Sequence, residues 1–356
     1  MSKTLGSLTV GAKIEVPVLS AYQSRFGSKI VFKIADKNHS GYPSNSVTLI
    51  TEKIIQLMCF DAKEPSNSNS DRKQYGNNRY QHSNILQWLN SNATAGAWYS
   101  AKHSADAPPN NANVWSNYNE YEAEAGFLNG FEQDFRDALL DDTITVAKSS
   151  TDGDGSEQIT RKVRLLTRTE VFGDTENGTA EGTKWPIFTD NNSRLAYPTA
   201  EAVSKSEYKT SGLSSSQPWW WWLLTPHAGG AGGVRDVRSG GGLGGRYAWR
   251  GDGGVRPALF LAPDTLVSDT TDTDGAYIIQ WNQPPTTPSS ISHGTPRAGQ
   301  SLTITTGGST DPEGDAISYV WERRVDSGAY TQIGITTAKS IVDTVPSSGT
   351  NYQVRV

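Results

Sequence analysis

Short apolar or alternating stretches, rich in β-branched residues, recur along the first two thirds of the chain. Residues 12–18, 29–35, 46–51 and 162–167 have this pattern, and each predicts a β-strand. After the last of these we expect a short helical turn around Glu170. The pattern therefore indicates a large domain with short strands and few helices.

Helical periodicity is confined to a few segments. Ser83 is a typical N-cap for a helix over 84–89, and phenylalanines spaced four apart from Phe127 onward predict a second helix over 126–140. Residues 199–208 predict another short helix. Long polar loops lie between these elements, at 65–78, 105–119 and 149–157. So much irregular chain favours a loop-rich α+β fold with about two main helices over a regular sandwich.

The composition changes near Trp281. A proline-rich stretch over 282–288 has the stiffness of a linker. Beyond it, alternating stretches predict strands over 301–305, 317–323 and 329–333. This pattern resembles a fibronectin type III or related immunoglobulin-like module, in which a tryptophan on the central strand fills the core. The resemblance implies that role for Trp321.

We therefore expect two domains. The first, over 1–282, is long enough for a large buried core. The second, over 283–356, would be a small all-β sandwich. Its last residues, 352–356, look like a penultimate strand, so we expect this sandwich to be truncated.

Charge and cysteine content bear on several classes of function. The 356 residues carry 32 Lys and Arg against 37 Asp and Glu, and the net charge of −5 gives no reason to expect nucleic-acid binding. The single cysteine, Cys59, lies in an apolar run, so we expect a buried thiol and no disulfide. The N-terminus lacks the apolar core of a signal peptide, and no apolar run is long enough for membrane insertion. We expect synthesis in the cytoplasm of a host cell.

The sequence shows no frame for catalysis or phosphate binding. The five histidines are scattered without metal-ligand spacing, and no G-x-S-x-G frame surrounds a serine. The glycines of 240–245 lack the Lys-Ser/Thr pair and the following helix of a phosphate-binding loop. We therefore expect neither enzymatic activity nor a cofactor. Acidic clusters at 269–275 and 311–315 leave calcium open as a ligand, although hairpin turns are the favoured explanation.

Four consecutive tryptophans, Trp219–Trp222, allow two interpretations. In a strand, alternate side chains face opposite sides, so two would enter the core and two the other face. Packing is the favoured interpretation for Trp221 and Trp222, and an aromatic platform for a sugar is the alternative. Trp249 differs, because it lies in polar sequence with few partners to bury it.

The most unusual segment runs from His227 to Gly254 and contains 12 of the 35 glycines. Two apolar stretches, 218–226 and 255–261, flank it and have the pattern of core strands. Glycine destabilises a strand because it loses more conformational entropy on folding than other residues do. Nothing in this sequence obviously needs so many positive φ angles. A patch displayed on a stiff frame and a flexible glycine-rich loop both fit this pattern.

The two flanks resemble the C-terminal signature of C-type-lectin-fold proteins, among them the variable proteins of diversity-generating retroelements in phages and prophages. Residues 31–50 and 162–171 also resemble this family, so the resemblance spans roughly residues 5–280. Some proteins of this fold oxidise cysteine, an activity that the apolar context of Cys59 does not support. The resemblance implies a C-type-lectin-like domain whose variable region covers about 225–257.

In such proteins, miscopied adenines scatter Asn codons to Gly, Asp, Ser, Arg, His and Tyr. The fixed apolar frame implied here is Val234, Val237, Leu243 and Ala248. The implied ligand-binding positions are His227, Gly229, Gly230, Gly232, Gly233, Asp236, Arg238, Gly244, Gly245, Arg246, Tyr247, Trp249, Arg250, Asp252 and Gly253. The expected anchors among them are Arg246, Tyr247, Trp249 and Arg250. Because glycines leave little side-chain surface, we expect this variant to bind weakly or to bind few targets.

The resulting hypothesis is a receptor-binding or adhesin-type protein of a phage tail. It would recognise a host cell-surface protein or glycan and assemble with other tail proteins in the virion. A homo-oligomer is left open, since no coiled-coil heptads are visible. The alternative is a carbohydrate-binding or structural tail protein that is not diversified.

Overall fold

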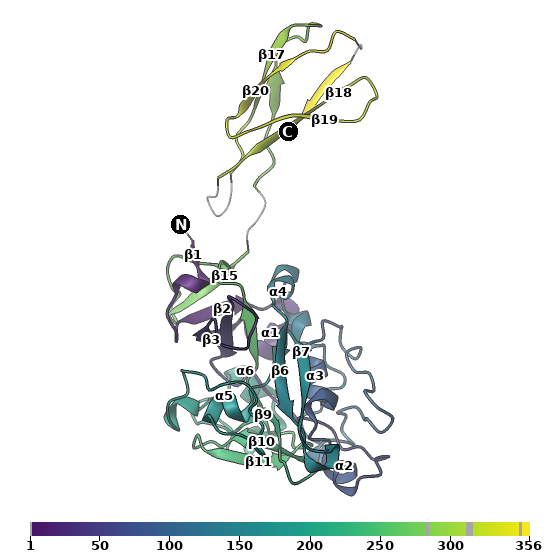
Figure 1. Cartoon of the computed structure of the whole chain (residues 1–356), viewed down its shortest axis with the longest axis vertical. Coiled ribbons are helices and arrows are strands. Elements are labelled where there is room, and N and C mark those ends of the chain that lie inside the picture. The colour runs from purple at the N-terminus through teal and green to yellow at the C-terminus, as the bar shows by residue number, and fades with distance from the viewer. Residues whose placement is uncertain (1, 282–284, 311–315, 349–350) are drawn as a thin grey trace. The chain divides into compact units, whose positions relative to one another are not determined.

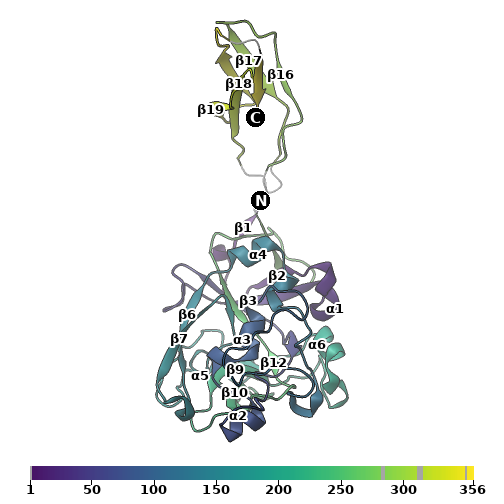
Figure 2. The same ribbon diagram turned by 90° about the vertical axis from the view of Figure 1, so that its right-hand side faces the viewer.

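The computed structural model describes residues 2–281, 285–310, 316–348 and 351–356 (Figure 1, Figure 2). The chain divides into two compact units, one over Lys3–Trp281 and one over Asn282–Val356 with the first two residues. Strands and short helices alternate in the larger unit, and this confirms the predicted α+β class. Among the described helices, none combines the length and apolar character that a membrane crossing requires.

An eight-stranded sheet runs through the larger unit in the order β1-β14-β15-β2-β3-β4-β13-β8. Its strands are β1 (Lys3–Thr4), β2 (Lys13–Pro17), β3 (Lys29–Lys37), β4 (Val47–Thr51), β8 (Val163–Arg164), β13 (Ala258–Leu261), β14 (Leu266–Val267) and β15 (Ala276–Gln280). The four predicted strands of this unit are confirmed as β2, β3, β4 and β8, although β8 is only two residues long. Every residue of β4 and β13 is buried, which agrees with the continuously apolar sequence of β13 and the β-branched and apolar residues of β4.

A second sheet has the order β11-β10-β9-β12-β5. Its strands are β5 (Gln56–Leu57), β9 (Trp221–Pro226), β10 (Gly233–Val237), β11 (Leu243–Tyr247) and β12 (Gly254–Val255). Much of the glycine-rich segment is therefore an antiparallel hairpin, β10–β11, at one edge of this sheet. A separate two-stranded ribbon consists of β6 (Asp142–Ala147) and β7 (Ser156–Arg161).

The helices of the described residues are all short. The α-helices are α1 (Gln23–Phe26), α2 (Ser70–Tyr75), α3 (Asn84–Leu89), α4 (Gln133–Ala138), α5 (Arg168–Phe172) and α6 (Ala200–Lys205). The 3-10 turns are Leu5–Ser7, Ser20–Tyr22, Tyr80–His82, Trp115–Asn117, Phe127–Gly130, Ser150–Asp152, Asn192–Arg194 and Glu207–Thr210. The expectation of about two main helices is therefore wrong, because the described residues contain six short α-helices and no long one.

Local capping explains where three of these helices begin. The hydroxyl of Ser83 accepts a hydrogen bond from the backbone N–H of Leu86, which confirms the predicted N-cap of α3. Thr199 caps α6 in the same way. Thr167 and Glu170 form a reciprocal capping box that starts α5, where the sequence predicted a helical turn.

The predicted helix over 126–140 is wrong as one element. A 3-10 turn ends at Gly130, Phe131 is extended with φ −126° and ψ 156°, and only then does α4 begin. Phe127, Phe131 and Phe135 are nevertheless buried in edge-on and tilted contacts with centroid distances of 5.1 and 4.9 Å. Their spacing therefore reflects one aromatic cluster in the core and not one helix.

Strand β9 carries tryptophans into two parts of the core. Trp222 packs with the cluster that contains Phe60, and Trp221 packs with the cluster that contains Phe188. Both rings are fully buried, and their Nε1 atoms donate to the carbonyls of Met58 at 2.9 Å and Arg194 at 3.1 Å. Packing is thus confirmed for these two residues, and the sugar-platform alternative is wrong for them. Cys59 is buried with a free thiol, as predicted.

The smaller unit contains two three-stranded sheets, β16-β17-β20 and β19-β18-β21. Its strands are β16 (Ile291–His293), β17 (Ser301–Thr306), β18 (Tyr319–Val325), β19 (Thr331–Thr336), β20 (Ser340–Thr344) and β21 (Tyr352–Arg355). The strands predicted from alternation correspond to β17, β18 and β19. Trp321 is fully buried, as expected for a core tryptophan, and its Nε1 donates to the hydroxyl of Thr336 at 2.9 Å.

Candidate ligand-binding groove

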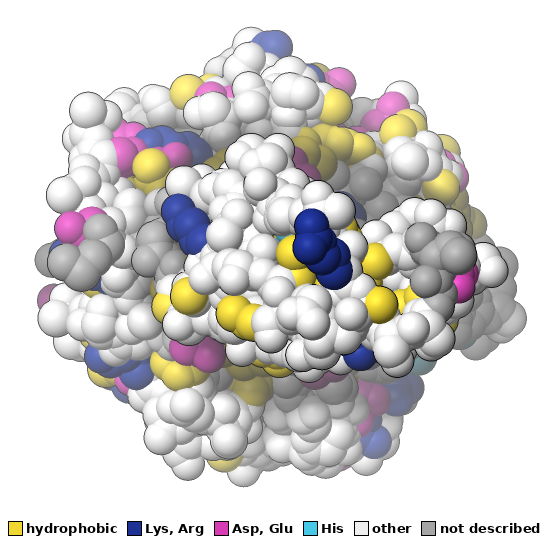
Figure 3. Space-filling view, turned by 90° about the horizontal axis from the view of Figure 1, so that it is seen from above, with side chains coloured by type: hydrophobic (Ala, Val, Ile, Leu, Met, Phe, Trp, Pro, Cys, Tyr) yellow, Lys and Arg dark blue, Asp and Glu magenta, His cyan; other side chains and the backbone are white. Residues whose placement is uncertain are grey.

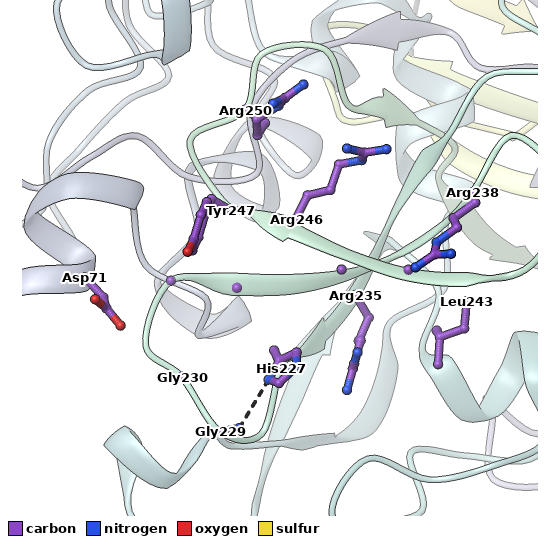
Figure 4. A pocket seen from close by; sticks show the side chains of 14 residues that line it. Asp71, His227, Gly229, Gly230, Arg235, Arg238, Leu243, Arg246, Tyr247 and Arg250 are labelled. Atoms are coloured by element: carbon purple, nitrogen blue, oxygen red, sulfur yellow. Dashed lines mark hydrogen bonds between the residues drawn. The ribbon is translucent and has the colours of Figure 1, made fainter.

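A groove of about 650 Å³ lies along the β10–β11 hairpin (Figure 4). The residues that line it are Asp71, His227, Gly229, Gly230, Gly232, Gly233, Arg235, Arg238, Leu243, Gly244, Gly245, Arg246, Tyr247 and Arg250. We refer to it as the hairpin groove. It brings together most of the positions that the sequence singled out, but not Asp236, Trp249, Asp252 or Gly253. Asp71, on α2, and Arg235 also line it and were missed by the sequence analysis.

A buried asparagine fixes the loop that leads into β10. The side-chain amide of Asn78 donates to the carbonyls of Gly230 at 2.7 Å and Gly233 at 3.0 Å. The backbone N–H of Asn78 donates to the carbonyl of Ala231 at 3.1 Å. These bonds satisfy backbone groups of a loop that has few side chains of its own. The glycine-rich loop is therefore held at defined points, and nothing in the sequence marked Asn78 for this role.

Glu176 holds the opposite side of this loop. Its carboxylate accepts two hydrogen bonds from Arg235, at 2.7 and 2.8 Å, and one from the backbone N–H of Ala228 at 2.9 Å. Arg168 also donates to it at 2.7 Å. Burial alone would raise the pKa of Glu176, but these donors outweigh it and lower the pKa to about 2. Arg235 is thus fastened to the frame by a bidentate ion pair.

The aromatic anchors differ in how freely they face solvent. Tyr247 is 48% exposed and stacks on Tyr75 with a centroid distance of 3.9 Å, so its other face is open. Trp249 is only partly buried, with an edge-on contact to Tyr75 at 6.3 Å. The guanidinium of Arg250 lies 3.6 Å above the ring of Trp115. Among the predicted anchors, Tyr247 presents the most open aromatic surface.

Asp252 and Asp236 are both buried and do not face the groove directly. Asp252 accepts two hydrogen bonds from Arg250, at 2.9 and 2.7 Å. Asp236 is 1% exposed, and neither carboxylate oxygen has a hydrogen-bond partner among the described residues. Burial raises the pKa of Asp236 to about 6, although nearby Arg246 and Arg238 oppose this shift. Neither of these two aspartates, which the sequence analysis placed among the ligand-binding positions, lines the groove.

The predicted variable glycines fall into three groups. Gly229 and Gly230 have open space or only distant neighbours where a Cβ would lie, and Gly245 would make only ordinary contacts. A Cβ on Gly244 would collide with the carboxylate of Asp236, which lies opposite it in the hairpin register. A Cβ on Gly253 would overlap the indole of Trp222. Gly232 and Gly233 are intermediate, with nearest contacts of 3.1 and 3.2 Å.

Backbone conformation explains only one glycine of this segment. Gly241 has φ +79° in the turn between β10 and β11, where its N–H donates to the carbonyl of Arg238 at 2.8 Å. The other described glycines between 229 and 254 have no positive φ. The sequence interpretation that positive φ angles do not account for these glycines is therefore confirmed. Close approach of neighbouring groups accounts for several of them instead.

A candidate metal-binding group lies elsewhere in the larger unit. Ligand atoms of Glu64, His103 and Asp106 lie within 4.8 Å of one another. Asp61 is buried beside them, and its pKa is raised by burial and by the neighbouring Glu64 and Asp106. Glu64 comes from one loop and His103 with Asp106 from another, so the spacing between histidines in the sequence could not indicate the group.

Of the two acidic clusters, one can be compared with the structure. Asp272 pairs with Lys29 and accepts hydrogen bonds from the backbone N–H groups of Asp274 at 3.0 Å and Ala276 at 2.8 Å. These bonds are those of the turn between β14 and β15, which is the explanation that the sequence favoured. The second cluster, 311–315, lies outside the described residues.

Charged side chains of both signs are visible in small separate groups in the space-filling view (Figure 3). Most of the described surface in this view is uncharged. This distribution agrees with the modest net charge of −5. Four arginines line the hairpin groove, and two of them, Arg235 and Arg250, are paired with the carboxylates of Glu176 and Asp252.

The fold and the groove together define a mixed α+β protein with a glycine-rich, arginine-lined cavity on an edge hairpin. Residues 45–263 match the DUF6273 family, which is described as a domain of unknown function. The chain belongs to this family. The matched region includes β9, the β10–β11 hairpin, Asn78 and Glu176. Neither a curated protein nor a solved structure matches the chain.

Proposed function

We propose that this chain is a ligand-binding protein and that the hairpin groove is its binding surface. The observation that carries the proposal is the coincidence of two independent features. Most of the positions implied to vary by the resemblance line a groove whose volume is typical of ligand sites, and the frame beneath them is fixed by Asn78 and Glu176. A preorganised backbone that presents exchangeable side chains is the design of an antibody paratope.

We also propose the finer fold assignments and a setting for this activity. Residues 1–282 would form a C-type-lectin-like domain, and 283–356 an immunoglobulin-like module. The protein would act in a phage tail or as an adhesin, where it recognises a host cell-surface protein or glycan without catalysis. The residue patterns that flank the hairpin support this assignment, as does the buried tryptophan of the smaller unit.

The second candidate is a binding or structural tail protein with a fixed, non-diversified hairpin. The glycines at 244 and 253 favour it in part, because packing requires glycine at both positions. The coding DNA discriminates between the candidates. A reverse transcriptase gene and an imperfect repeat of the 225–257 region nearby would support diversification, and their absence would favour the fixed hairpin.

A glycan array and a protein-partner screen test the binding proposal. The parent protein is compared with a variant in which a bulky uncharged side chain fills the groove. Gly245→Trp adds an indole at a residue that lines the groove, where a Cβ makes only ordinary contacts. Gly240→Trp is the matched control, because Gly240 is an exposed residue with open space around it that does not line the groove. We expect the first variant to lose the parent's ligands and the second to keep them. Equal binding by all three proteins would overturn the proposal.

A further inference from the structure

The four arginines that line the hairpin groove are not equivalent. Arg235 is engaged by the carboxylate of Glu176 through two hydrogen bonds. Arg250 is engaged in the same way by Asp252 and is stacked on Trp115. Each of these guanidiniums uses its planar, forked donors within the protein. Their charges are balanced by neighbouring carboxylates.

The other two guanidiniums form no ion pair or side-chain hydrogen bond with a carboxylate of the described residues, although the buried Asp236 lies near both. Arg238 is exposed, and its side chain makes no hydrogen bond or ion pair with the described residues. Arg246 lies 4.6 Å above the ring of Trp220, and its Nε is a buried donor without a hydrogen-bond acceptor among the described residues. Arg246 also lines the groove, and it forms no ion pair with a carboxylate of the described residues. An anionic ligand in the groove would therefore lie beside a guanidinium whose charge is not already paired.

Other features of the groove restrict the kind of anion. Its volume of about 650 Å³ suits a small ligand or a few sugar rings and not an extended protein surface. The floor at Gly230 and Gly245 has no side chains, so a ligand can approach the backbone closely. The open face of Tyr247 lies at one side and offers an apolar surface of the kind on which a sugar ring packs.

We propose that the hairpin groove binds an acidic saccharide, with Arg238 and Arg246 providing the positive charge for its carboxylate groups. This inference rests on the proposed function of the groove. Guanidinium and carboxylate match in planarity and in spacing of donors and acceptors. Arg235 and Arg250 position the groove and do not bind the ligand directly.

The test is a quantitative array of carboxylated, sulfated and neutral oligosaccharides, together with acidic peptides, probed with the full chain. Arg238→Gln with Arg246→Gln removes the two unpaired charges. Arg136→Gln with Arg161→Gln is the control of equal charge, because neither residue lines the groove. We expect carboxylated saccharides to bind and the first double variant to lose at least about tenfold in affinity, while the control stays near the parent. Binding should also weaken when the salt is raised to about 0.5 M.

The remaining outcomes separate this inference from the proposed function. Binding that Gly245→Trp abolishes but that the arginine variant retains would overturn the acidic-saccharide proposal and leave the groove as the site. Preference for sulfated or neutral saccharides, or for acidic peptides, would overturn it in the same way. Ligands that bind equally to the parent and to Gly245→Trp would overturn both proposals.

Discussion

Gly229, Gly230 and Gly245 have room for a side chain, whereas Gly244 and Gly253 have none, although all five lie in the same glycine-rich segment. The first group lines the hairpin groove and has room for a Cβ, whereas a Cβ in the second group would collide with the carboxylate of Asp236 or the ring of Trp222. Glycine content alone therefore has two different physical origins in this hairpin. One group is free to be exchanged, and the other is required by packing.

The largest effect is expected at Gly253. The substitution Gly253→Ala places a methyl group within the indole of Trp222, which is fully buried and donates to the carbonyl of Met58. We expect a loss of at least about 3 kcal/mol in the free energy of unfolding, because a tightly packed core cannot absorb the overlap. Thermal unfolding followed by tryptophan fluorescence measures this loss. A melting temperature equal to the parent's would show that packing does not require glycine at position 253.

Gly244→Ala should cost about 2 kcal/mol, because its methyl group competes with the Asp236 carboxylate for one position. A double-mutant cycle with Asp236→Ala checks the cause, since removal of the carboxyl makes room for the methyl group. We expect the cost of Gly244→Ala to fall below about 1 kcal/mol in that background. An unchanged cost would mean that backbone strain, and not Asp236, requires glycine there.

The pH dependence of stability should reveal Asp236 itself. Its folded-state pKa of about 6 lies above the ordinary value of 3.8, so the folded protein keeps a proton that the unfolded chain releases between these values. Stability from this group is present at low pH and is lost as the pH rises from about 4 to about 6. Asp236→Asn should therefore gain on the order of 2 kcal/mol over the parent between pH 4 and pH 8. Parallel stability curves for the two proteins would contradict this account.

The smallest effect is expected at the open glycines. Gly229→Ala and Gly230→Ala add a methyl group where the nearest atoms are at least 3.9 Å away or absent within 4 Å. We expect changes in the free energy of unfolding within about 0.5 kcal/mol, because the added methyl group meets no neighbouring atom closely. Urea unfolding of both variants, of Gly253→Ala and of the parent measures these changes. Losses comparable with those at Gly253 would abolish the distinction between the two groups.

How far the sequence alone reveals this molecule depends on the range of the interactions. Local signals were sufficient for the strands β2, β3 and β4 and for the N-cap Ser83, because alternation and capping act over a few residues. The phenylalanines from Phe127 onward led to a wrong prediction, because the side chains of one aromatic cluster happen to recur at helical spacing. The 3-10 turn and the short helix α4 found there are stabilised mainly by packing, which helix propensity does not predict.

The candidate site shows the same limit. The segment itself was visible from its glycines and flanks, and most of the singled-out positions line one groove. The burial of Asp236 and Asp252, and the supports supplied by Asn78 and Glu176, depend on contacts between residues far apart in the chain. Whether a glycine has room for a Cβ depends on such contacts as well. The sequence could therefore indicate where the surface lies but not which of its residues are exchangeable.

Saturation mutagenesis of residues 227–254 on the displayed full chain, with sorting for folded protein, tests the central claim most directly. The account predicts that Gly229, Gly230, Arg238, Gly245 and Tyr247 accept most side chains, and that Gly244 and Gly253 accept almost none. The same tolerance at both sets of positions, or tolerance confined to Gly244 and Gly253, would contradict an exchangeable surface on a fixed frame.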